Sequence, residues 1–175
     1  MGQVHTGAHT WSAGRPVRTP IRAAGASRIA HNGPMLPTLE FSDTNDGVDW
    51  AALKAALAAD RFDNGRTPEE YAASYGRSHA VVFVRHGERF VGSARLLSDA
   101  VCNAYLVDVW TASAYRRRGV ASEMVRRLLA TVPGQHVALF TEDMRPLYEG
   151  LGFEVEHGGM SRVVGTWLNR PGPQG

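Results

Sequence analysis

At its centre the sequence reads Asp108-Val-Trp-Thr-Ala-Ser-Ala-Tyr-Arg-Arg-Arg-Gly-Val-Ala-Ser122. This segment comprises the end of an apolar strand, a basic turn with a single glycine, and the start of an amphipathic helix. Such a turn leaves several backbone N–H groups unpaired at the helix N-terminus, where the helix dipole adds a partial positive charge. The segment is therefore a candidate cradle for a phosphate group.

Composition is typical of a globular domain. Apolar residues make up 43% of the 175 residues and charged residues 21%, and no uninterrupted apolar run reaches the roughly 18 residues of a membrane span. A single cysteine, Cys102, excludes an internal disulfide and a multi-cysteine metal site, and is expected to be a small buried apolar residue. These features predict a cytoplasmic protein with no membrane partner.

The positive charge is concentrated at the N-terminus. Residues 1–34 carry four arginines and no acidic residue, which leaves 15 basic against 17 acidic residues, a net charge of −2, for residues 35–175. A slightly acidic domain argues against nucleic acid as a partner. Because residues 1–34 are rich in Gly, Ala, Ser, Thr and Pro without periodicity, they are expected to be a disordered extension, with a transit peptide as the alternative.

From Leu36 onward the pattern predicts one domain of the mixed α/β class. Thr67-Pro-Glu-Glu70 has the form of a capping box, and apolar residues from Val120 to Val132 recur at helical spacing. The expected order is a strand at 38–41, a helix to about 59 that Asp46 and Asp49 can cap, a helix at 67–75, strands at 80–85, 89–97 and 104–110, and a helix at 120–132. A strand at 136–140, a helix at 144–150 capped by Asp143, and strands near 153–157 and 161–168 follow.

The basic turn has the pattern R-x-x-G-x-A, from Arg116 to Ala121. It matches neither GxxxxGK[ST] nor GxGxxG, so a P-loop and a Rossmann site are both excluded on spacing. Gly119 allows the backbone to approach a ligand closely, and Ala121 adds only a methyl group. Taken alone, the pattern is equally compatible with an exposed arginine cluster.

A second motif lies downstream, Leu147-Tyr148-Glu-Gly-Leu-Gly-Phe153. With the turn and the order of elements between them, it resembles the GNAT superfamily of acetyl-CoA-dependent N-acetyltransferases over residues 36–170. In that family Q/R-x-x-G-x-G/A is the pyrophosphate-binding signature, and a tyrosine precedes an x-x-x-G-F ending. The resemblance implies a GNAT-like acyl-CoA N-acyltransferase fold, in which a largely antiparallel central sheet is flanked by helices.

The resemblance also implies acetyl-CoA as co-substrate, with no metal. The strand before the turn would splay from its neighbour and pair with the pantetheine arm, and an N–H group near Val109 would donate to the thioester oxygen. Thr141 stands where many family members have an asparagine that reaches this arm. The implied cofactor-binding residues are Val107, Val109, Trp110, Arg116, Arg117, Arg118, Gly119, Val120, Ala121, Ser122 and Thr141.

Two residues are candidates for catalysis. The resemblance makes Tyr148 the general acid that protonates the departing thiolate, and packing of the last helix is the alternative. Strand alternation puts Asp108 on one face with Leu106 and Trp110, so it is either a buried cleft residue that acts as base or a solvated one. Glu142 and Asp143 are weaker candidates for the base.

The acceptor is expected to be an amine of a small molecule or a protein, bound near residues 60–66 and 155–168. The acidic domain weakly favours a cationic amine. A non-catalytic acyl-CoA sensor and a transferase of longer acyl groups are the alternatives, and a homodimer stays open. His79, His86, His136 and His157 have neither HxH nor HxxxH spacing among them, which predicts no metal site. Aromatic residues line either the acceptor pocket or the core: Trp50, Phe62, Tyr71, Tyr75 and Trp110.

Overall fold

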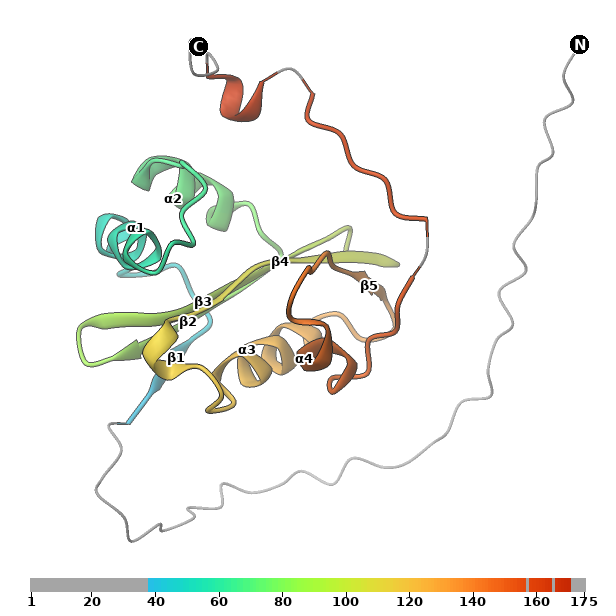
Figure 1. Ribbon diagram of the computed structural model, residues 1–175, viewed down its shortest axis with the longest axis horizontal. Coiled ribbons are helices and arrows are strands. Elements are labelled where there is room, and N and C mark those ends of the chain that lie inside the picture. Colours follow the sequence, from blue (N-terminus) through green and yellow to red (C-terminus); the bar gives the residue numbers. More distant parts are fainter. Residues whose placement is uncertain (1–37, 157, 165, 171–175) are drawn as a thin grey trace, which may run out of the picture. The chain divides into compact units, whose positions relative to one another are not determined.

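The computed structural model describes residues 38–156, 158–164 and 166–170 (Figure 1). The chain divides into two units, Met1–Leu36 and Pro37–Gly175, and the description below concerns the second. The predicted disorder of residues 1–34 lies outside the described residues. No helix in the described part is long and apolar enough to cross a membrane.

One sheet of five strands forms within the described residues, in the order β1-β2-β3-β4-β5. The first four strands are mutually antiparallel, whereas β5 is parallel to β4. This confirms the mixed α/β class with a largely antiparallel sheet. The strands are β1 (Glu40–Ser42), β2 (Ala80–His86), β3 (Arg89–Ser98), β4 (Asn103–Thr111) and β5 (His136–Ala138).

Helices cover both faces of the sheet (Figure 1). On one face α1 (Trp50–Ala59) and α2 (Pro68–Gly76) bury Leu53, Leu57 and two tyrosines against Phe83 and Trp110. On the other face α3 (Val120–Leu129) packs Met124 and its neighbours against apolar side chains of β2, β3 and β4. The short helix α4 (Arg145–Glu149) adds Tyr148 to this second core. The sheet therefore separates two apolar layers.

The local signals in the sequence account for the first two helices. Asp49 accepts a hydrogen bond from the backbone N–H of Ala52 at 2.9 Å and begins α1. Thr67 and Glu70 form the predicted reciprocal capping box of α2. Hydrogen bonds of this kind satisfy N–H groups that the helix itself leaves unpaired. The predicted cap at Asp49 and the predicted capping box are therefore confirmed, and α1 begins at Trp50.

The prediction of two last strands was wrong. Residues 153–156 and 158–164 form no strand, and the next regular element is the 3-10 turn η2 (Trp167–Asn169). Because β5 ends at Ala138, it offers only a short edge to which a further strand could pair. Gly158 also has φ +103°, which turns the chain away from an extended course.

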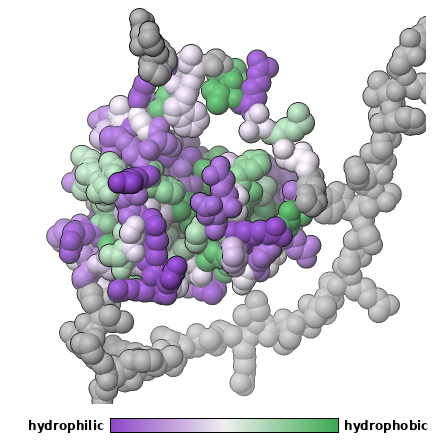
Figure 2. All heavy atoms as spheres, viewed as in Figure 1, coloured by the Kyte–Doolittle hydropathy of each residue, from purple (hydrophilic) through white to green (hydrophobic). Residues whose placement is uncertain are grey.

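Apolar side chains consequently stand on the surface of this C-terminal segment. Met160 is 94% exposed and Val164 83% exposed. In the space-filling view the segment mixes hydrophobic and hydrophilic residues and stands clear of the body of the domain (Figure 2).

Two smaller expectations were also wrong. Cys102 is exposed rather than buried, because it lies in the turn between β3 and β4, where its thiol donates to Asp99. Asp143 does not cap α4; the hydroxyl of Thr141 accepts from the N–H of Met144 at 3.2 Å instead. Both turns are organised by local polar contacts that the apolar periodicity does not register.

Candidate active site

The turn between β4 and α3 carries unpaired backbone donors. Gly119 has φ +78° and is the N-cap residue of α3, and the N–H of Glu123 is the first to donate to its carbonyl, at 2.9 Å. Within the residues that the structure describes, no acceptor contacts the backbone N–H groups of residues 117–122. Several donors therefore point out of one helix N-terminus, which is the arrangement that binds phosphate.

Arg116 braces this turn from behind. Its Nη2 donates to Asp60 Oδ2 at 2.7 Å and its Nε to the carbonyl of Thr111 at 3.0 Å. Asp60, at the end of α1, also accepts from Trp110 Nε1 at 2.9 Å and from the N–H of Ser113 at 3.0 Å. The sequence did not single out Asp60, although it links α1, β4 and the turn. Arg117 and Arg118 are exposed, with the guanidinium carbon of Arg118 5.6 Å from the centroid of the Tyr115 ring.

The contacts of Asp60 predict a pH-dependent stability. Burial raises the pKa of its carboxyl, but hydrogen bonds from Ser113 and Trp110 and the charge of Arg116 lower the pKa by more, to below its ordinary 3.8. A depressed pKa stabilises the fold above the ordinary value, and the contribution is lost as the pH falls through the folded-state pKa. We therefore expect Asp60→Asn to reduce the free energy of unfolding at pH 7 by about 1–3 kcal/mol.

Urea unfolding between pH 7 and pH 3 tests this expectation. The difference between Asp60→Asn and wild type should shrink towards the acid end, whereas Asp143→Asn, at an exposed side chain, should track wild type throughout. A difference for Asp60→Asn that stays constant with pH would contradict the assigned cause.

Strand β4 parts from β5 beside the turn. The two strands pair only from Asn103 to Tyr105, so the rest of β4 has no pairing on that side in the described residues. On the β3 side the register skips Asp108 and Val109, and Asp108 has φ +56°, which marks a β-bulge. The open edge of β4 therefore coincides with the bulge and leads into the turn.

The bulge corrects the predicted alternation along β4. Leu106 packs in the core with α3, whereas Trp110 packs in the core with α1 and α2. The prediction that Asp108 shares a face with both was wrong, because one extra residue in a strand reverses every side chain beyond it.

Asp108 meets two arginines that the sequence analysis did not connect to it. Arg66 Nη2 and Arg95 Nε both donate to Asp108 Oδ2, each at 2.6 Å. The side chain of Asp108 is 14% exposed, so it is neither a freely solvated residue nor an isolated buried carboxylate. The sequence contains a pattern that could have indicated this contact. Arg95 and Asp108 each interrupt an otherwise apolar strand, which is typical of a buried ion pair.

Tyr148 lies in α4, half-buried against the core that Val109 and Val120 also join. Its ring meets that of Phe153 edge-on with centroids 5.8 Å apart, and its hydroxyl bonds to no residue in the described part of the chain. Burial raises the pKa of Tyr148 above its ordinary 10.0. The phenol consequently stays protonated at neutral pH, as a proton donor requires.

The predicted site residues after β5 lie on the surface. Thr141, Glu142 and Asp143 are all exposed, and the Thr141 hydroxyl is engaged by the N–H of Met144. Of the five aromatic residues considered for the acceptor pocket, Tyr71, Tyr75 and Trp110 are buried core residues and Trp50 packs against them. Phe62 is 40% exposed and lies in the loop between α1 and α2.

This loop is held by the C-terminal turn. Trp167 Nε1 donates to the carbonyl of Asn64 at 3.0 Å, and Arg170 donates to the carbonyl of Gly65 and to Glu70. The two regions expected to form the acceptor site therefore contact each other directly.

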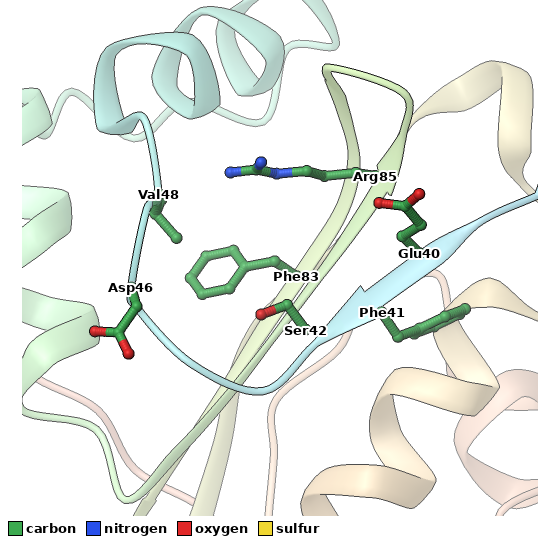
Figure 3. A pocket seen from close by; sticks show the side chains of 7 residues that line it. All are labelled: Glu40, Phe41, Ser42, Asp46, Val48, Phe83 and Arg85. Atoms are coloured by element: carbon green, nitrogen blue, oxygen red, sulfur yellow. The ribbon is translucent and has the colours of Figure 1, made fainter.

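A surface pocket lies elsewhere, at the edge formed by β1 and β2 (Figure 3). Figure 3 shows Phe83 and Arg85 pointing towards the segment that carries Asp46 and Val48, where Arg85 Nη2 donates to the carbonyl of Gly47 at 3.0 Å. None of the predicted site residues line this pocket, which is formed by Glu40, Phe41, Ser42, Asp46, Val48, Phe83 and Arg85.

A splayed pair of strands beside an open helix N-terminus defines an acyltransferase fold, and the comparisons agree. The model of the acetyltransferase (GNAT) family matches residues 50–153. The chain belongs to this family and is a GNAT-family acetyltransferase, which implies an acyl-CoA co-substrate and an amine acceptor. No curated protein matches the chain.

Solved structures share the fold. A Deinococcus radiodurans protein assigned as an acetyltransferase is 27% identical with a TM-score of 0.62, covering 71% of this chain and 87% of its own. A GNAT-family acetyltransferase from Streptococcus pneumoniae is 21% identical with a TM-score of 0.61, covering 73% and 98%. Glucosamine-6-phosphate N-acetyltransferase from Arabidopsis thaliana is 16% identical with a TM-score of 0.58, covering 72% and 98%.

Proposed function

We propose that the protein transfers the acetyl group of acetyl-CoA to a primary amine of a small molecule or a protein, by direct attack of the amine on the thioester. The observation that carries this proposal is the row of unpaired N–H groups from residue 117 to 122 at the start of α3, beside the open edge of β4. Family membership supports it, because the family implies an acyl-CoA co-substrate.

In this proposal the turn from Arg117 to Ser122 binds the pyrophosphate through backbone N–H groups. Arg116 acts as a brace, because its Nη2 and Nε donate to Asp60 and to the carbonyl of Thr111. The open edge from Val107 to Trp110 pairs with the pantetheine arm. The bulge at Val109 turns backbone groups out of the regular ladder, which suits a donor to the thioester oxygen.

The chemistry needs a neutral amine, a stabilised tetrahedral intermediate and a proton for the departing thiolate. Tyr148 is the proposed proton donor, because it shares a core with Val109 and Val120 and keeps its proton at neutral pH. Asp108 suits a structural role better than that of base, because its carboxylate joins Arg66 of the loop between α1 and α2 to Arg95 of β3. The proton lost by the attacking amine would then go to water.

Release of free thiol from acetyl-CoA with a panel of amines, followed by mass detection of the product, tests the proposal. Acetylated amine is the expected result. Binding of acetyl-CoA without thiol release would instead favour an acyl-CoA sensor, and turnover only with longer acyl groups would favour a different acyltransferase.

Gly119→Ala tests the phosphate cradle within the same assay. A Cβ atom at φ +78° meets nothing within 4 Å, so the cost is backbone strain of about 1–2 kcal/mol rather than a clash. The turn is expected to relax and misdirect its N–H groups, which raises the Kd for CoA by up to about tenfold, measured by isothermal titration calorimetry.

Gly134→Ala is the matched control. Gly134 has φ +80° and equally open surroundings, but lies in the turn beyond α3. It should lose similar stability without any change in CoA affinity. Equal Kd values for the two variants would remove the turn from the binding site.

A further inference from the structure

Arg66, Arg95 and Asp108 form a nearly dry cluster with unbalanced charge. Their side chains are 8%, 13% and 14% exposed, and two guanidinium groups share one carboxylate. Charges that are removed from water are costly unless an opposite charge compensates them. The cluster therefore carries one excess positive charge in an environment that favours a further anion.

Neighbouring acidic residues do not supply that anion. Asp63 pairs with Lys54 at 2.7 Å, and Glu70 pairs with Arg170. Each of these carboxylates already has its own cation, so the excess charge stays with the cluster.

The two arginines differ in how many donors they use. Arg66 is fully engaged: Nε donates to Asn64 at 3.0 Å, Nη1 to Ser74 at 2.9 Å and Nη2 to Asp108, and its guanidinium lies 4.2 Å from the centroid of the Tyr71 ring. Arg95 donates only through Nε. Its Nη1 and Nη2 bond to no residue in the part of the chain that the structure describes. The Nη1 and Nη2 groups of Arg95 therefore form a planar pair of donors that a ligand could use.

This pair of donors lies next to the open edge of β4. Arg95 pairs in register with Val107, one residue before the bulge. Ala94 and Leu96, its neighbours in β3, belong to the core with α3, so Arg95 projects to the opposite face of the sheet. On that face it contacts the Tyr75 ring of α2, with 5.8 Å between guanidinium carbon and centroid.

An aromatic pair borders the same region of the sheet. Tyr105 precedes Val107 by two residues in β4, and its ring meets that of Phe140 edge-on with centroids 5.9 Å apart. Phe140 is 67% exposed. An apolar surface beside a cationic side chain is suited to a ligand that has both an apolar part and an anionic group.

We infer that Arg95 binds a carboxylate of the acceptor, so that the substrate is a small amine that also carries a carboxylate, as an amino acid does. A guanidinium fork matches a carboxylate in bidentate geometry. One excess positive charge balances a monoanionic carboxylate, whereas a phosphate monoester carries about −1.5 to −2 at neutral pH. The inference rests on the proposed function, since it names the substrate class of the same site.

The test compares amines in matched pairs, each an amino acid and its carboxamide, with acetyl-CoA. The expected kcat/KM is about 10- to 100-fold higher for the carboxylate member. Arg95→Gln should abolish that preference, so that the ratio of kcat/KM between the two members of each pair falls to about 1. Arg95→Lys keeps the charge but not the fork and should retain only part of the preference.

A Kd for CoA equal to that of wild type would show that these variants are folded. Equal use of both members of each pair by wild type overturns the inference and leaves the acetyltransferase proposal intact. Calorimetric titration of the same pairs into the CoA complex gives a readout without turnover. Carboxylate binding that depends on Arg95, without thiol release, supports the anion site and refutes the transfer reaction; the absence of any preference in both assays overturns the inference.

Discussion

Tyr148→Phe is expected to lower kcat by about 100-fold or more while the KM for acetyl-CoA stays within about twofold. The thiolate of CoA needs a proton as it leaves, and general acid catalysis contributes about 10²–10⁴-fold. Phenylalanine keeps the ring that packs edge-on against Phe153, so the variant removes only the hydroxyl. Steady-state kinetics with acetyl-CoA and an accepted amine give both constants.

Tyr115→Phe is the matched control, because it also removes one hydroxyl from a half-buried tyrosine. The Tyr115 hydroxyl bonds to His86 at the end of β2, so this variant should leave kcat near the wild-type value. Because burial raises the pKa of Tyr148 above 10.0, wild-type kcat should show no loss from this group below about pH 10. A wild-type kcat in Tyr148→Phe would remove Tyr148 from the mechanism.

Local signals account for the parts of the fold that the sequence predicts well. The Asp49 cap and the capping box from Thr67 to Glu70 involve residues only three apart, so they can be recognised in one dimension. The strands expected after Phe153 have an apolar pattern of the same quality. A pattern shows which side chains can be buried, but not whether a paired strand exists, and β5 ends at Ala138.

The candidate site also combines local features, which the sequence predicts, with long-range contacts, which it does not. The turn around Gly119 and the motif at Tyr148 are local and were found from the sequence. The contacts of Asp108 join residues 42 and 13 positions away, and no periodicity connects them. The bulge also reverses the facing of β4 residues, which strict alternation cannot anticipate. The residues that the sequence analysis missed, Arg66 and Arg95, depend on tertiary structure.

Asp108→Asn is expected to reduce the free energy of unfolding by about 3–5 kcal/mol, because it leaves two nearly buried guanidinium groups without their shared carboxylate. Arg66 belongs to the loop between α1 and α2, so the loss should also loosen that loop from β4. Urea unfolding measures the first effect, and amide hydrogen exchange over residues 60–66 measures the second.

Asp63→Asn is the control for Asp108→Asn, because it disrupts a more exposed ion pair that involves the same loop. The Lys54–Asp63 pair is 28% and 23% exposed, and the carboxylate also accepts from Tyr71 Oη at 3.1 Å and from the N–H of Gly65 at 3.2 Å. Asp63→Asn should therefore cost about 1–2 kcal/mol, less than Asp108→Asn. The two roles considered for Asp108 differ in what they change. As an anchor, its replacement destabilises the fold and alters acceptor binding through the loop, whereas a general base would leave unfolding unchanged and lower kcat with a shifted pH profile. Wild-type stability in Asp108→Asn, together with a large loss of kcat, would assign the carboxylate to proton transfer, since a bystander of the reaction cannot produce that combination.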